Sequence, residues 1–296
     1  MSCITSKQQC PICAAHGVWR RTGTTLGVGE IFACPTCGGL FLHPPKPVQC
    51  ENSGWTDLRE RRWAEDVQIA TAHAPRIARW FEDTTGRRLR TVLEIGCGSG
   101  FMGVGFKRIG LNYLGTDIDS ASLSIASHNG VTVLNCAAED LAAELAGNSF
   151  DLIVSSNTFE HVANLPAAFD SLGRLAFVRA VVIVPNALGL LPRLKAWPSW
   201  RVLANRWCRT SRDIAYSIDG YWHNVGLTKK TLGHLALRSG LKVVSNSTIS
   251  VNDRIFGFVQ RNRSTAYRAL STASSLIDAN SQVKIVLAGR DSKSRQ

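Results

Sequence analysis

The chain has 296 residues, of which 45% are hydrophobic and 19% are charged, a composition typical of a globular protein. Its 34 basic and 22 acidic side chains give a formal net charge of +12, which indicates affinity for anionic partners. No run approaches the roughly 18 uninterrupted apolar residues of a membrane span, and no secretion signal is visible, so we expect a cytoplasmic protein without a membrane span.

The first fifty residues contain two CxxC pairs that are separated by twenty residues. Four thiolates at this spacing are typical of a tetrahedral zinc ribbon, and because no coordination position stays open, the zinc would be structural. A proline-rich segment, 43–47, predicts a linker after this module. We therefore predict a zinc-binding module over 1–50 and a second domain over 51–296. The predicted zinc ligands are Cys10, Cys13, Cys34 and Cys37.

Beyond the linker, a helical pattern over 55–83 is followed by alternating apolar strands and helices. Strands are expected at 91–95, 112–116, 131–135, 150–155 and 180–184, with helices at 101–109, 120–128 and 167–176. A helix at 229–239 and strands at 242–244, 255–259 and 283–287 complete the pattern. This alternation predicts an α/β fold in which helices cover both faces of a mainly parallel sheet.

The first of these strands runs into the turn Gly96-Cys97-Gly98-Ser99-Gly100, which opens a helix. Glycines let the backbone turn tightly and allow a ligand to approach, and the helix start presents free N–H groups. Asp117 ends the next strand, Glu139 and Asp140 follow the third, and Asn157 follows the fourth. Ligands bind at such carboxyl ends in an open α/β sheet, so these residues predict one binding site.

The segment VLEIGCGSG, followed by GTDID, AAEDL, FDLIVSSNTFEHV and VVIVPN, resembles the class I S-adenosylmethionine-dependent methyltransferases over roughly residues 55–260. The resemblance implies a Rossmann-like fold with a seven-stranded sheet and S-adenosylmethionine as cofactor. It implies that the glycine turn holds the amino-acid part of the cofactor, that the next acidic residue binds the ribose, and that later residues line the adenine and the sulfonium. In that order, the implied cofactor residues are Glu94, Gly96, Gly98, Gly100, Asp117, Ala138, Glu139 and Asn157. The segment 31–42 also resembles the zinc knuckle of a subgroup that acts on sugars and secondary metabolites.

Two histidines are candidate catalytic residues. A hydroxyl acceptor must lose its proton, and histidine suits this task near neutral pH. His161 follows the fourth strand, and His223 lies in the polar, aromatic segment Tyr221-Trp222-His223-Asn224. We predict that His223 is the general base and that His161 shapes the pocket wall, with the exchange of these roles as the alternative.

A basic insertion over 187–225 is expected on the substrate side of the second domain. Between residues 171 and 212 there are eight basic side chains, no acidic one, and three interleaved tryptophans. Such a segment could attract a phosphate-bearing substrate, nucleic acid or an anionic membrane surface, or it could be a solvated face.

These observations leave three hypotheses about function. The first is a methyltransferase for a small hydroxylated acceptor, namely a sugar, a glycan or a related metabolite that could bear phosphate. The second is an RNA methyltransferase, which the positive charge and the zinc ribbon favour. The third is a non-catalytic binding module with a methyltransferase fold, against which the intact glycine turn and Asp117 count.

Overall fold

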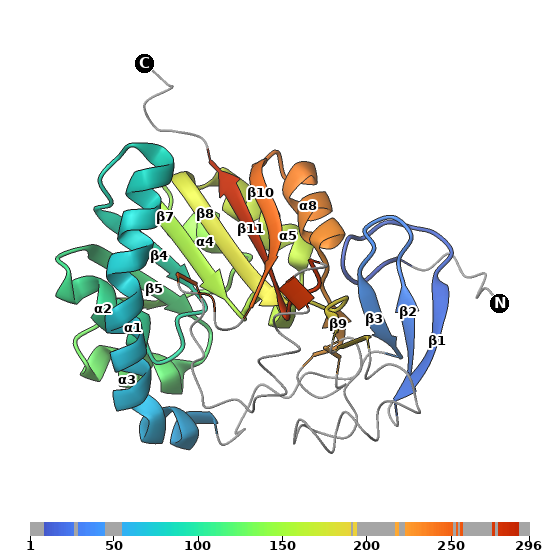
Figure 1. The fold of residues 1–296 in the computed structure, drawn as a ribbon, viewed down its shortest axis with the longest axis horizontal. Coiled ribbons are helices and arrows are strands. Elements are labelled where there is room, and N and C mark those ends of the chain that lie inside the picture. Colours follow the sequence, from blue (N-terminus) through green and yellow to red (C-terminus); the bar gives the residue numbers. More distant parts are fainter. Residues whose placement is uncertain are drawn as a thin grey trace.

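The computed structural model describes residues 9–26, 29–44, 55–190, 192–193, 217–218, 223–250, 253, 255–256, 274–275 and 278–289. A large twisted sheet lies at the centre of the molecule and carries helices on both faces (Figure 1). A smaller sheet, built mainly from the N-terminal segment, lies to one side of it.

The large sheet contains seven strands, of which five adjacent ones are parallel. In spatial order the strands are β10 (Lys242–Ile249), β11 (Gln282–Ala288), β8 (Ala176–Pro185), β7 (Ser149–Ser156), β4 (Thr91–Ile95), β5 (Asn112–Asp117) and β6 (Val133–Asn135). The five strands from β8 to β6 are parallel, whereas β11 runs antiparallel to both of its neighbours. The predicted mainly parallel sheet of seven strands is therefore confirmed.

Apolar residues on both sides of the strands explain the two helical layers, since successive strand residues point to opposite faces. Val92 of β4 belongs to the buried cluster on the side of α1 (Trp55–Thr85), whereas Leu93 and Ile95 belong to the cluster on the opposite face. The first face also carries α2 (Phe101–Arg108) and α3 (Ser120–His128). The second face carries α4 (Leu141–Glu144), α5 (Leu165–Arg174) and α8 (Lys229–Arg238). A 3-10 turn, η1 (Phe159–His161), follows β7.

The small sheet combines three N-terminal strands with one strand from much later in the chain. It consists of β1 (Arg20–Leu26), β2 (Gly29–Ala33), β3 (Leu40–His43) and β9 (Val225–Gly226). Its core is aromatic, with the rings of Trp19 and Phe41 in edge contact at 4.6 Å. β9 begins at Val225, the last residue of the predicted insertion, so the N-terminal module shares its sheet with the second predicted domain. The domain boundary at residue 50 stays a prediction.

One predicted strand is wrong at its start. The segment 255–259 was expected to be extended, but Ile255 and Phe256 lie in a turn. The carboxylate of Asp253 accepts hydrogen bonds from both of their backbone N–H groups, at 2.9 and 2.8 Å. These bonds occupy N–H groups that a strand would use to pair with its neighbour, so they favour a turn. Residues 257–259 lie outside the described part of the chain.

Across the described residues, every helix is too short or too polar to pass through a membrane. The expected cytoplasmic location stays a prediction.

Candidate functional site

The glycine turn lies at the carboxyl end of β4, in the middle of the parallel part of the sheet. Gly96, Gly98 and Gly100 have φ angles of 75°, 52° and 77°, a left-handed conformation that favours glycine. The backbone N–H groups of Gly96 and Cys97 both donate to the carbonyl of Thr116, at 2.7 and 2.9 Å. The turn is therefore fixed against β5.

Asp117, at the end of β5, lies directly against this turn. One of its carboxylate oxygens accepts a hydrogen bond from the Gly98 N–H at 2.7 Å, and the other accepts from the Asp119 N–H at 3.0 Å. An ionised carboxylate offers about four acceptor sites, so capacity for two ligand hydroxyls is left over. The structure brings together the two features that were predicted to bind the cofactor, and their roles stay predictions.

Glu94 is buried in β4 and accepts a hydrogen bond of 2.5 Å from the Tyr113 hydroxyl of β5. Burial raises the pKa of Glu94 to about 8; the Tyr113 hydroxyl acts against this shift, and the negative charge of Asp117 adds to it. The side chain therefore links two neighbouring strands directly below the glycine turn. Its predicted contact with the cofactor stays a prediction.

The remaining predicted cofactor residues also lie at this edge of the sheet. Ala138 is buried, and the carboxylate of Glu139 accepts a hydrogen bond from the Asn164 N–H at 3.0 Å. Asn157, just after β7, has a positive φ of 54°, which asparagine tolerates better than most residues. Its amide oxygen accepts a hydrogen bond from the Gln282 side chain at 3.2 Å, so β11 holds this residue in place.

Thr158 was missed by the reasoning from sequence. A Cβ atom on Gly96 would lie 2.0 Å from the Thr158 Oγ1, which is far too close, so the segment leading into η1 packs directly on the glycine turn. The Thr158 hydroxyl also donates to the carbonyl of Ile95, at 3.2 Å. Nothing in the sequence around Thr158 signals this contact, because it depends on how two strands pair.

The two candidate catalytic histidines lie side by side. The rings of His161 and His223 stack with their centroids 4.7 Å apart and an interplanar angle of 30°. Glu160, which is 5% exposed, joins them, and the ligand atoms of all three side chains lie within 4.8 Å of one another. Burial raises the pKa of Glu160 to about 7, while a hydrogen bond from its own backbone and the charge of His223 act against this shift.

Glu160 is a second residue that the sequence reasoning missed, although its position next to His161 could have signalled it. Of the aromatic segment predicted around His223, Tyr221 and Trp222 lie outside the described residues. The carbonyl of Asn224 accepts a hydrogen bond from the Leu42 N–H at 2.9 Å, which ties this segment to β3.

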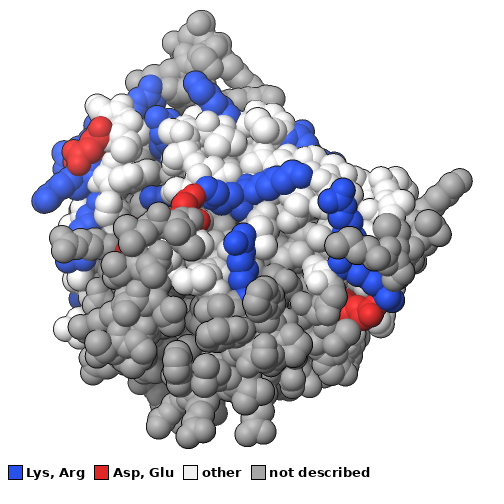
Figure 2. Space-filling view, turned by 45° about the vertical axis from the view of Figure 1, so that its right-hand side comes forward, with Lys and Arg blue, Asp and Glu red and all other residues white. Residues whose placement is uncertain are grey.

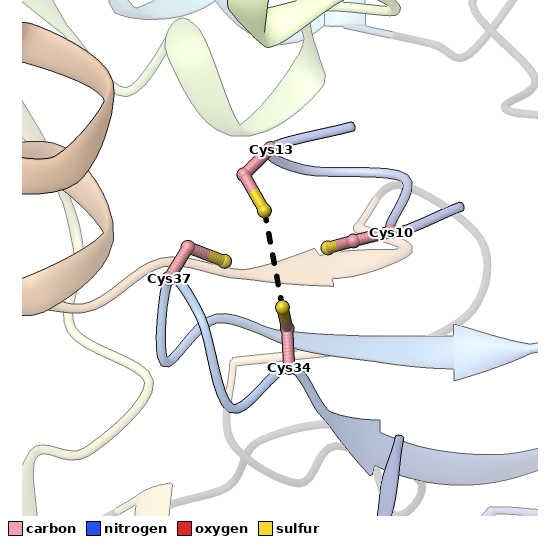
Figure 3. A group of neighbouring side chains, drawn as sticks. All are labelled: Cys10, Cys13, Cys34 and Cys37. Carbon is pink, nitrogen blue, oxygen red and sulfur yellow. Dashed lines mark hydrogen bonds between the residues drawn. The ribbon is translucent and has the colours of Figure 1, made fainter. Parts of the chain in front are cut away.

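The four predicted zinc ligands form one cluster, and their sulfur atoms point toward a common centre (Figure 3). All four thiols are buried and free of disulfide bonds, and their sulfurs lie within 4.8 Å of one another. The Cys13 and Cys34 sulfurs are 3.8 Å apart. A tetrahedral site with Zn–S bonds of about 2.3 Å separates its sulfurs by about 3.8 Å, so the cluster fits a zinc ion.

The cysteine cluster is docked on α8. The Lys230 ammonium donates to the carbonyl of Pro35 at 2.9 Å, and the Arg238 guanidinium donates to the carbonyl of Cys13 at 3.0 Å. One basic side chain therefore holds each cysteine turn. On the face that includes this region, basic side chains are scattered and outnumber the acidic ones (Figure 2). Most of the predicted basic insertion, including 194–216, lies outside the described residues.

Comparison with known proteins identifies the fold and the family. A family model for a methyltransferase domain matches residues 59–246, which is more than half of the chain. The chain belongs to this family. The prediction of a class I S-adenosylmethionine-dependent methyltransferase is thereby confirmed.

Two curated relatives of this methyltransferase are ubiquinone biosynthesis O-methyltransferases. The protein from Pseudomonas paraeruginosa is 27% identical over 161 residues, which cover 46% of this chain and 69% of the relative. The protein from Paraburkholderia xenovorans is 31% identical over 122 residues, which cover 38% of this chain and 52% of the relative.

A solved structure shows the same fold. The plantazolicin methyltransferase BpumL, determined in complex with SAH, aligns with a TM-score of 0.50 and 14% sequence identity. The alignment covers 80% of this chain and 89% of that protein.

Proposed function

We propose that this methyltransferase transfers the methyl group of S-adenosylmethionine to a hydroxyl group of a small acceptor. The observation that carries the proposal is the cluster of Glu160, His161 and His223. Thr158 packs on the glycine turn, so this cluster begins two residues from a direct contact with the predicted cofactor site. Methyl transfer depends largely on positioning, but a hydroxyl acceptor must also be activated, and these side chains can do so.

The same edge of the sheet supports S-adenosylmethionine as the cofactor. The glycine turn would face the amino-acid part, Asp117 the ribose hydroxyls, Ala138 and Glu139 the adenine, and Asn157 the sulfonium. The fit of Asp117 rests on its spare acceptor sites beside the Gly98 N–H. The SAH bound in the plantazolicin methyltransferase BpumL supports a cofactor of this kind.

The acceptor class is proposed as a small molecule with a free hydroxyl group. The names of the curated relatives, ubiquinone biosynthesis O-methyltransferases, support oxygen as the atom that is methylated. The resemblance of residues 31–42 to the zinc knuckle of sugar and secondary-metabolite enzymes favours a sugar, glycan or related metabolite. The names of the relatives add hydroxylated precursors of a quinone to the acceptors that should be tested.

We further propose that the four clustered cysteines hold a structural zinc ion. All four ligand positions come from the protein, so zinc would contribute to folding and would not bind substrate. Its effect on the reaction would be indirect. The zinc would fix β3, which pairs with β9, and β9 begins two residues after His223.

A radiolabel experiment tests the proposed function. The protein is incubated with S-adenosylmethionine labelled in its methyl group and with three acceptor pools: phenols and catechols, sugars and glycosides, and total RNA. We expect label in one of the two small-molecule pools, bound through oxygen. Label found only in RNA would support the RNA methyltransferase, which the net charge of +12 favours, and would contradict the proposal.

A further inference from the structure

Glu160 is a carboxylate whose surroundings are incomplete. The residue is 5% exposed, and its Oε2 atom has no hydrogen-bond partner among the residues that the structure describes. Leaving a polar atom buried and unpaired costs free energy, and buried carboxylates are normally paired or bound to a metal. This oxygen therefore indicates that a positively charged group belongs beside it.

Two imidazoles lie next to this carboxylate and come from different parts of the chain. His161 is the neighbouring residue in η1, and His223 arrives from the segment before β9. The ligand atoms of the three side chains lie within 4.8 Å of one another. Ligand atoms at about 2.0–2.2 Å from one metal ion lie roughly 3–4.4 Å from one another. The three side chains would therefore have to move together only slightly to bind the same ion.

We propose that Glu160, His161 and His223 form a second metal site, which binds a divalent cation of the zinc or manganese type. Imidazole nitrogens suit zinc and carboxylate oxygens suit manganese, so a mixed set of two imidazoles and one carboxylate can bind either cation. Three protein ligands leave at least one coordination position for another molecule. The side chain of His161 is exposed, so one side of the cluster borders solvent.

The site differs in kind from the cysteine cluster. The cysteine cluster offers four buried sulfurs and no open position, whereas this group offers nitrogen and oxygen ligands with an exposed side. The first arrangement is typical of a structural zinc, and the second is typical of a metal that contacts substrate. The two sites should therefore differ in metal preference and in resistance to chelators.

This inference rests on the proposed function where it concerns catalysis. A bound cation would hold the acceptor oxygen and lower the pKa of its O–H group, so that the proton leaves to water. The oxygen then attacks the methyl carbon of S-adenosylmethionine; the O–C bond forms as the S–C bond breaks, and S-adenosylhomocysteine leaves. His223 would then act as a metal ligand, and the predicted role of general base would pass to water.

Manganese titration of the full-length protein tests the site directly. One equivalent of zinc is first bound to the cysteine cluster, and metal at the more open second site is removed by brief dialysis against a chelator. Mn²⁺, which does not displace zinc from thiolates, is then added, and free Mn²⁺ is followed by electron paramagnetic resonance. We expect the wild-type protein to bind one Mn²⁺ beyond its zinc. Glu160→Gln and His223→Asn should each weaken Mn²⁺ binding at least tenfold. His128→Asn, in the last turn of α3, is the control and should bind as the wild type does.

Zinc content and thermal unfolding midpoint are measured for each variant, so that a fold defect is recognised. If Glu160→Gln does not fold, His161→Asn replaces it in the same titration. Absence of Mn²⁺ binding by the wild type, or equal binding by the cluster variants, would overturn the proposal. The readout needs no methyl acceptor, so Mn²⁺ binding without methylation of any hydroxyl would leave the metal site standing and contradict the proposed function. Full methylation by chelator-treated protein that retains its zinc would overturn the catalytic role of the cation.

Discussion

The imidazole rings of His161 and His223 stack 4.7 Å apart, although one follows β7 and the other precedes β9. β9 pairs with β3, and the Leu42 N–H of β3 donates to the carbonyl of Asn224. β3 in turn begins three residues after Cys37. The position of His223 therefore depends on the cysteine cluster, whereas the glycine turn belongs to the other sheet.

This arrangement predicts what the loss of the proposed zinc ion should do. Removal of zinc with a thiol-reactive mercurial should lower kcat strongly while S-adenosylmethionine affinity changes little, because β3 and β9 would separate and the cofactor edge would remain. Cys34→Ser should have the same effect, and Cys136→Ser, a buried cysteine outside the cluster, is the control. Elemental analysis, calorimetry and kinetics measure the three quantities. Protein purified without chelator that contains no zinc would contradict the prediction.

A second prediction concerns the ribose contact. Asp117→Ala should weaken S-adenosylmethionine binding by about 1–3 kcal/mol, because ligand hydroxyls and the Gly98 N–H would lose their acceptor. Calorimetric titration measures the change. Asp83→Ala, at an exposed position of α1, is the matched control. An unchanged affinity for Asp117→Ala would remove this residue from the cofactor site.

A third prediction follows from Glu94, whose pKa burial raises to about 8 from an ordinary value of 4.5. The folded chain then holds this proton more tightly than the unfolded chain does. The contribution of Glu94 to stability is therefore present at low pH and is lost as the pH rises from about 4.5 through 8. Tyr113, Asp117 and Cys97 are the titratable groups that face it.

Glu94→Gln should remove this dependence. The decrease in unfolding free energy between acidic and mildly basic pH should become smaller in the variant by on the order of 2–4 kcal/mol. Urea unfolding at several pH values measures it, and Glu82→Gln on the exposed side of α1 is the control. Parallel pH profiles for the wild type and Glu94→Gln would show that the carboxyl group has no raised pKa.

The features that could be predicted from sequence are those marked by a local sequence pattern. The apolar runs of β7 and β8 predict buried parallel strands, the glycine turn predicts a tight ligand-binding loop, and the CxxC pairs predict a metal cluster. Each signal is contained in a few consecutive residues. For this reason the sheet and the positions of Asp117 and the four cysteines follow from sequence alone.

The unpredicted part depends on long-range pairing or on a single side-chain bond. The contact of Thr158 with Gly96 arises because β7 and β4 are neighbours. Glu160 gains its significance only when β9 brings His223 to it. At residue 255, one carboxylate, that of Asp253, converts an apolar segment into a turn. None of these relationships leaves a periodic pattern in the sequence.

The basic insertion gives a fourth prediction. If the acceptor is RNA, many phosphates are neutralised together, and the logarithm of affinity should fall steeply and linearly with the logarithm of salt concentration. If it is a small phosphate-bearing molecule, turnover should fall only modestly with salt. We expect the modest dependence. A gel-shift titration with total RNA at low salt measures the first case, and strong binding there would favour the RNA methyltransferase.

The last prediction concerns which of the two histidines activates the acceptor. His223→Ala should lower kcat by roughly 10²–10⁴ with little change in cofactor affinity, the range usual for loss of acid–base or equivalent activation. The wild-type rate should also fall at acidic pH, because a protonated imidazole can neither accept a proton nor bind a cation. His128→Ala is the control, since its side chain lies on α3 outside the cluster.

Added Mn²⁺ distinguishes the two possible roles of His223: it should partly restore the variant if His223 is a metal ligand, and it should have no effect if His223 is a general base. Near-normal turnover of His223→Ala with loss of turnover in His161→Ala would exchange their roles. Normal turnover in both variants would mean that the acceptor needs no activation, as expected for an amine, and would contradict the assignment of a hydroxyl acceptor.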